Sequence, residues 1–292
     1  CKSLKEFTVP SFIKIIGNSS FQFCSRLKTI IIPSSVIHIM NSAFNGCLLL
    51  ESIDIPSVKY IGNSAFKNCR KIKKFTIPTI RAIKEYTFSG MSSLTEITIP
   101  SSVHYLGNFA FSNCTLLEKI NIPSSVECIR DYVFKGCKSL TNCIIPDSTE
   151  FIGKGIFNQC TSLKEVTLPS FLTEINDEMF AGCISLTKIN TSSSISYIGD
   201  GAFSDCQSLK EINISRNLKF LGENSFYNCT SLTQIKIPSS ISILSRNTFS
   251  YCYNLTKISI PCSVKKIRSR AFLGLENLIE IYIPSSVKSI GK

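Results

Sequence analysis

Apolar residues recur along this chain with a period of 23 positions, and each period marks one structural unit. The shared pattern reads C-x-S-L-x-x-I-x-I-P-S-S-V-x-x-I-G-N-x-A-F-x-G/N, and residues 91–113 show it almost whole. Its phenylalanine column, in which two of the intervals shorten to 22 residues, consists of Phe21, Phe44, Phe66, Phe88, Phe111, Phe134, Phe157, Phe180, Phe203, Phe226, Phe249 and Phe272. Self-similarity at such a period is typical of a repeat architecture.

Two short strands and one turn are predicted in each unit. Ile97 and Ile99 alternate with polar residues, which is the period of a strand with one buried face, and Pro100 ends the strand because proline has no N–H. Val103 and Leu106 then begin a second extended segment on the opposite side of the coil. In seven units an Asn or Asp three residues before the Phe is expected to cap a helical or 3-10 turn, which a Gly or Asn two residues after the Phe would close in most units.

The units are expected to stack into a solenoid, because one unit is too small to fold alone. Counted from the cysteine column, residues 1–292 hold twelve full units and a partial thirteenth, which we interpret as a single domain. The chain begins inside a unit at Cys1, ends inside another at Lys292, and shows no polar cap. Since terminal units of solenoids need such caps, we expect it to be a fragment of a longer chain.

The unit L-x-x-I-x-I-P-S-S-V-x-x-I-G-x-x-A-F-x-x-C resembles the BspA-type leucine-rich repeat, a class found in surface proteins of bacteria and of some parasitic protozoa. The resemblance covers all 292 residues. It implies a right-handed leucine-rich repeat coil of 23-residue units with short parallel strands, and a role in adhesion or protein binding. It carries no catalytic residues. Departures from the pattern at Cys143, Thr149, Thr191, Ser192 and Ser215 are expected to disturb the units at 137–159 and 183–228.

Eleven of the 14 cysteines share one column, which Met91 and Leu275 complete, so the column is apolar. We expect these cysteines to be buried free thiols, because side chains of one inward column point in parallel and not at each other. Cys128 and Cys262 lie outside the column and are candidates for exposed, reactive thiols. No C-x-x-C pair occurs, so a zinc site is not expected.

Aromatic rings stand two residues before a glycine in five units, at Tyr60, Tyr105, Phe151, Tyr197 and Phe220. They could form an exposed adhesion surface. The simpler interpretation is that each ring covers the gap beside the glycine, since residues two apart share a face of a strand.

The sequence offers nothing for catalysis, and we expect a non-enzymatic protein without a cofactor or a metal. Walker, G-x-G-x-x-G, nucleophile-elbow and H-E-x-x-H motifs are all missing, and the acids are scattered singly.

Outward residues of the first strand are the candidate ligand face. Leucine-rich repeats generally bind through this face, so by resemblance it implies a protein or glycan ligand; the alternative is a merely solvated sheet. The candidates are Lys73, Lys74, Thr76, Thr98, Asn121, Thr167, Asn190 and Asn213.

Basic residues concentrate toward both ends of a chain whose formal net charge is +12. The densest groups are Lys67, Arg70, Lys71, Arg81 and Lys84, and then Lys265, Lys266, Arg268 and Arg270. Such patches could engage anionic glycans, acidic proteins or a membrane surface, or could simply keep the protein soluble. Because no nucleic-acid-binding signature occurs, nucleic acid is not an expected partner.

The sequence therefore predicts a non-enzymatic leucine-rich repeat binding scaffold that is displayed at the cell surface or secreted. Two alternatives stay open: an intracellular structural or assembly spacer, and attachment to polyanions through the basic ends. No apolar run is long enough for a transmembrane segment, and a cytoplasmic location is not excluded.

Overall fold

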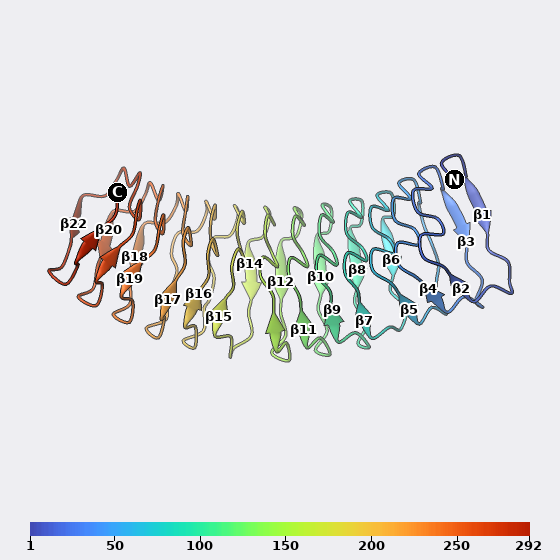
Figure 1. Cartoon of the computed structure of the whole chain (residues 1–292), viewed down its shortest axis with the longest axis horizontal. Coiled ribbons are helices and arrows are strands. Elements are labelled where there is room, and N and C mark those ends of the chain that lie inside the picture. The colour runs from blue at the N-terminus through green and yellow to red at the C-terminus, as the bar shows by residue number, and fades with distance from the viewer. The chain divides into compact units, whose positions relative to one another are not determined.

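The computed structural model describes residues 1–292, which form two compact units, an N-terminal part of residues 1–156 and a C-terminal part of residues 157–292. Each part is a β-solenoid built from short parallel strands, with no helix (Figure 1). Each turn of the coil contributes a second strand of two residues, and most turns also contribute a first strand of three residues on the opposite side of the interior. Residues 51–55 hold the place of a first strand but form none.

The first strands coincide with the predicted I-x-I segments. In the N-terminal part they are β1 (Glu6–Thr8), β3 (Thr29–Ile31), β6 (Lys74–Thr76), β8 (Glu96–Thr98), β10 (Lys119–Asn121) and β12 (Asn142–Ile144). In the C-terminal part they are β14 (Glu165–Thr167), β18 (Gln234–Lys236), β20 (Lys257–Ser259) and β22 (Glu280–Tyr282).

The second strands coincide with the predicted V-x-x-I segments. In the N-terminal part they are β2 (Ile15–Ile16), β4 (His38–Ile39), β5 (Tyr60–Ile61), β7 (Ala82–Ile83), β9 (Tyr105–Leu106), β11 (Cys128–Ile129) and β13 (Phe151–Ile152). In the C-terminal part they are β15 (Glu174–Ile175), β16 (Tyr197–Ile198), β17 (Phe220–Leu221), β19 (Ile243–Leu244), β21 (Lys266–Ile267) and β23 (Ser289–Ile290).

Strands pair in parallel between equivalent residues of neighbouring units. Ile97 of β8 pairs with Phe75 of β6 and with Ile120 of β10, so the register equals the repeat. The expected irregularity is confirmed at 183–228, where the segments 187–191 and 210–214 form no regular strand. It is wrong for 137–159, where β12 is intact, Cys143 is buried, and the buried Thr149 donates a hydrogen bond to the Val126 carbonyl at 3.0 Å.

The phenylalanine column forms the centre of the core. From Phe44 to Phe249 every ring of the column is fully buried. Within the N-terminal part the Phe111 ring stacks on Phe88 at 5.4 Å and on Phe134 at 5.9 Å between centroids. Each unit of this column from Phe44 to Phe249 thus buries its phenylalanine against its neighbours.

The turn around each Phe is not helical, so this part of the sequence prediction is wrong. Two residues of every turn have positive φ, as do Phe109 at 56° and Asn113 at 57°, and such residues interrupt an α-helix. The N–H groups of Phe109, Phe111 and Asn113 instead donate to carbonyls of the next unit at 2.9, 2.9 and 2.6 Å. The turns therefore add a third column of hydrogen bonds between units.

The predicted N-cap residues also connect units. The Asn108 Oδ1 atom accepts a hydrogen bond from the Asp131 N–H at 3.1 Å, and the Asp131 Oδ1 atom accepts one from the Lys154 N–H at 3.1 Å. In the units that hold Asn or Asp in this column, the short side chain brings an acceptor oxygen within reach of the neighbouring backbone.

The glycine that precedes this column is required by close packing of the backbone. A Cβ atom on Gly62 would lie 2.6 Å from the Asn41 nitrogen and 2.8 Å from the Met40 carbonyl carbon. The space beside the glycine is thus filled by the preceding unit, and the interpretation that the aromatic ring covers it is wrong. Two of these rings stack on each other instead: the centroids of Tyr197 and Phe220 lie 4.9 Å apart.

The column cysteines are free thiols, and all of them except Cys1 are buried. The Cys137 thiol donates to the Phe111 carbonyl at 3.2 Å, and most other members of the column make the same bond to the preceding unit. Cys262 is exposed, as predicted. Cys128 is half-buried, and burial raises the pKa of its thiol despite the nearby Arg130, so the prediction of an exposed, reactive thiol is wrong there.

We expect iodoacetamide to alkylate Cys1 and Cys262 in the folded protein and to leave Cys114 unmodified. Burial raises the pKa of the Cys114 thiol to about 12. Even at about pH 9 its thiolate fraction is therefore only on the order of one thousandth. Mass spectrometry of the labelled peptides checks this. Labelling of Cys114 before unfolding, at the rate of Cys262, would contradict the buried column.

Candidate ligand-binding faces

The first strands of the N-terminal part present a flat polar face. Thr76, Thr98 and Asn121 are exposed and occupy paired positions on β6, β8 and β10. Lys74 and Glu96 form an exposed ion pair across the same strands, with 2.6 Å between Nζ and Oε1. The hydrogen bond between them raises the pKa of Lys74 and lowers the pKa of Glu96. Because both groups are exposed, this pair orders the surface more than it stabilises the fold.

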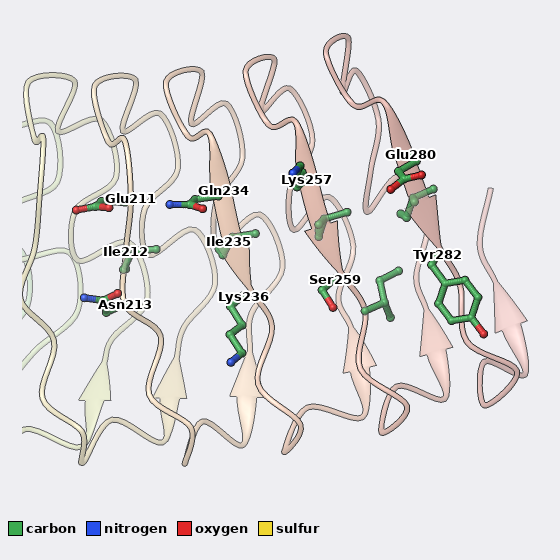
Figure 2. A pocket seen from close by; sticks show the side chains of 13 residues that line it. Glu211, Ile212, Asn213, Gln234, Ile235, Lys236, Lys257, Ser259, Glu280 and Tyr282 are labelled. Atoms are coloured by element: carbon green, nitrogen blue, oxygen red, sulfur yellow. The ribbon is translucent and has the colours of Figure 1, made fainter.

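The first strands of the C-terminal part line a groove of about 840 Å³. Figure 2 shows two rows of side chains along it. One row contains Glu211, Gln234, Lys257 and Glu280, and the other contains Asn213, Lys236, Ser259 and Tyr282. The rows run straight because equivalent residues pair, as Gln234, Lys257 and Glu280 do along β18, β20 and β22.

The predicted ligand-face residues are all exposed, but only some come together. Lys74, Thr76, Thr98 and Asn121 lie on adjacent strands, and Asn213 lines the groove of the C-terminal part. The other three candidates are also exposed, but they do not line that groove and do not belong to the paired positions on β6, β8 and β10; they are Lys73, Thr167 and Asn190. Lys257 and Tyr282 occupy the same outward columns and also line the groove.

The two predicted basic patches are divided among different faces. Lys67 and Arg70 line a hollow over the turns, whereas Lys73 and Lys74 lie at the first strands and Arg81 directly precedes the second strand β7. Lys71 and Lys84 are outside that hollow.

The C-terminal basic group is partly neutralised. The Arg268 guanidinium lies 3.2 Å from the Glu223 carboxylate, and Lys266 and Arg268 border a hollow of about 390 Å³ with that acid. Lys265 and Arg270 do not line it.

The hollow over the turns of the N-terminal part has a volume of about 530 Å³ and is lined by Tyr86 and Phe109, two members of a stack of three rings. Tyr86 stacks on Phe109 at 4.8 Å, and Phe109 stacks on Tyr132 at 5.0 Å. These residues were missed. The available signal was three successive aromatic residues in a column that holds Ser, Gly, Asn, Glu or Arg in every other unit.

No helix of this chain has the length and apolar character needed to cross a membrane, and no three His, Cys, Asp or Glu side chains come together as metal ligands.

The family model described as BspA type Leucine rich repeat region matches residues 1–90, 81–197 and 173–292. Among solved structures, a leucine-rich repeat protein from Bacteroides ovatus is 32% identical with a TM-score of 0.76, and the match covers 95% of this chain and 78% of that one. A leucine rich cell surface protein from Faecalibacterium prausnitzii is 27% identical with a TM-score of 0.71, covering 94% and 86%.

The pneumococcal vaccine antigen PcpA is 25% identical with a TM-score of 0.64, and its match covers 97% of this chain and 73% of that one. No curated protein sequence matches the chain. Since the family model spans the whole chain and the repeat columns form the strands and core described above, this protein belongs to the BspA-type leucine-rich repeat family.

Proposed function

We propose that this chain is a non-enzymatic binding scaffold, displayed at the cell surface or secreted, that recognises a protein or glycan partner through its first-strand face. The observation that carries the proposal is the groove of about 840 Å³ in the C-terminal part. Its two outward rows are not part of the buried core, so they are free to make contacts with a partner.

The groove combines the side chains that contribute most to protein recognition. Tyr282 is 76% exposed at one end of a row, and Lys236 and Lys257 stand among acids and amides. Aromatic and charged residues on a rigid surface are typical of binding hot spots. The strands that carry them pair in parallel, and Ile235 and Ile258 anchor them in the core. Little conformational entropy is therefore lost when a partner binds.

The proposed location rests on the relatives. The similar protein from Faecalibacterium prausnitzii is described as a cell surface protein, and PcpA is described as a vaccine antigen.

The test is a screen of the wild-type chain against arrays of extracellular-matrix proteins and glycans, followed by titration of every ligand found. Lys236→Glu and Tyr282→Ala are each expected to lower the affinity at least about tenfold, because each removes a charged or aromatic anchor from the groove.

Lys219→Glu is the matched control, because Lys219 is exposed just before the second strand β17 and does not line the groove. It makes the same charge change and is expected to leave the affinity within about twofold. Unchanged binding of both groove variants, or an equal loss in the control, would exclude this face. A parent protein built into an intracellular assembly, with no ligand in the screen, would favour the spacer interpretation.

A further inference from the structure

The turns between residues 85 and 136 carry a surface feature that the fold does not need. Tyr86, Phe109 and Tyr132 have φ of 55°, 56° and 56°. A left-handed conformation costs a residue with a side chain roughly 1–2 kcal/mol. Other units reach the same conformation with smaller residues, such as Ser64 at 57° and Gly155 at 59°. Three successive aromatic residues are therefore not required by the turn, since Ser64 adopts the same φ with a small side chain.

Cations are held beside the rings at the two ends of the stack. The Lys67 Nζ atom lies 4.4 Å from the centroid of the Tyr86 ring, and the Lys135 Nζ atom lies 5.0 Å from that of Tyr132. Both lysines line the hollow of about 530 Å³ together with Arg70. Cation–π contacts restrict the ammonium groups without neutralising them, so the charges stay available to an anion.

No acidic residue lines this hollow. Two acids of the same turns have other partners: the Glu85 carboxylate accepts a hydrogen bond from the Asn108 amide at 3.2 Å, and Asp131 accepts one from the Lys154 N–H at 3.1 Å. The hollow is thus a site of concentrated positive charge, with Ser92 and Thr115 among its remaining polar lining.

We propose that this hollow binds an acidic glycan, a saccharide chain that carries sulfate or carboxylate groups. The site is separate from the first-strand face and does not depend on the function proposed for that face. Lys67, Arg70 and Lys135 bind the anionic groups, and the hydroxyls of Ser92, Thr115 and Tyr86 bind the sugar hydroxyls between them. The positively polarised edges of the stacked rings add attraction for ligand oxygens.

A saccharide fits this hollow better than an acidic peptide. A peptide usually pairs its backbone with a free strand edge or inserts side chains into apolar pockets. Here the backbone is occupied, because the N–H groups of Tyr86, Gly90 and Phe109 already donate to the next unit. The ring faces are also covered by each other, so only the ring edges and polar groups remain for the ligand.

The experiment titrates the full chain with a sulfated heparin octasaccharide by isothermal titration calorimetry. Lys67→Gln together with Lys135→Gln is expected to weaken binding at least about tenfold, because both charged contacts are lost. Tyr86→Ser together with Phe109→Ser is expected to weaken it about threefold or more without a change in charge, because Lys67 loses the ring beside it and the Tyr86 hydroxyl is removed. The serine variants keep the fold, since serine occupies this position in three other units.

The matched control is Lys73→Gln together with Arg81→Gln, which removes the same charge outside the hollow. It is expected to change the affinity less than about twofold at about 150 mM salt, where distant charges are screened. Equal losses in the control and in the Lys67 and Lys135 variant would mean diffuse charge attraction and would overturn the proposal. The proposal also fails if the octasaccharide does not bind, if its desulfated form binds equally, or if polyglutamate binds as tightly with the same sensitivity.

Discussion

Replacement of Phe111 by alanine is expected to lower the free energy of unfolding by about 3–5 kcal/mol, the largest effect of a single substitution in this core. The ring is fully buried and stacks on both neighbouring rings of its column. Its removal leaves a cavity that the adjoining units cannot close, because their own turns are fixed by hydrogen bonds between units. Urea unfolding followed by circular dichroism measures the loss.

Phe12→Ala is the matched control for this substitution. Phe12 is 78% exposed, so the same change removes little buried surface and is expected to cost less than about 0.5 kcal/mol. Because arrays of repeats can unfold in stages, amide exchange in the units around Phe111 should rise in parallel. Equal stability of the Phe111 and Phe12 variants would refute mutual burial as the basis of the fold.

Gly107→Ala is expected to destabilise the protein by about 1–3 kcal/mol, although alanine ordinarily stabilises a chain relative to glycine. A Cβ atom on Gly107 would lie 2.7 Å from both the Glu85 nitrogen and the Lys84 carbonyl carbon. These are backbone atoms of the preceding unit, so the two units must move apart to accept it. Thermal unfolding of the variant beside the wild type reports the change.

Gly17→Ala is the control that separates the steric clash with the neighbouring unit from the general effect of replacing glycine by alanine. Gly17 occupies the same column in an earlier unit. There the added Cβ atom would meet only the Ser20 hydroxyl, at 3.3 Å. We expect that variant to range from neutral to about 0.5 kcal/mol more stable. If close approach of the backbones is the cause, the change in stability has opposite signs at Gly17 and Gly107. A similar loss of stability in both variants would point to another cause.

The sequence was sufficient to predict the strands and the interior. Ile97 and Ile99 alternate with polar residues, and a phenylalanine occupies the position of Phe111 in the other units. Periodicity alone therefore assigned these residues to a buried face. Thr149 was correctly placed inward, and the structure adds that its hydroxyl is satisfied by the Val126 carbonyl.

The turn could not be predicted in the same way. An Asn such as Asn108 before a Phe and a Gly after it are compatible with a capped helical turn and also with a chain of turns containing two left-handed residues. The choice depends on hydrogen bonds to the next unit, which a pattern within one unit does not contain. The capping preferences of single residues therefore suggested a helical turn, whereas hydrogen bonds to the next unit favour the non-helical turn that is observed.

The candidate sites were predictable only in part. The outward columns followed from strand alternation, so Thr98 and Asn213 were found on exposed faces. The stack of Tyr86, Phe109 and Tyr132 and its lysines were missed, because the turn backbone that aligns these rings was itself predicted wrongly. A basic group that is contiguous in sequence was likewise divided by the coil, since Lys67 and Lys73 lie on different sides of one unit.

The bond from most column cysteines to the carbonyl of the phenylalanine in the preceding unit has a genetic consequence. Its acceptor is a main-chain atom that every unit supplies, and its donor recurs in nearly every unit, so most junctions between units are chemically equivalent. Unequal recombination that adds or removes a whole number of units would recreate the same junctions on both sides of the crossover. Genes of this type can therefore change the length of the encoded protein without passing through a misfolded intermediate, and alleles that differ by multiples of 23 codons should be tolerated where single-codon changes inside a turn are not.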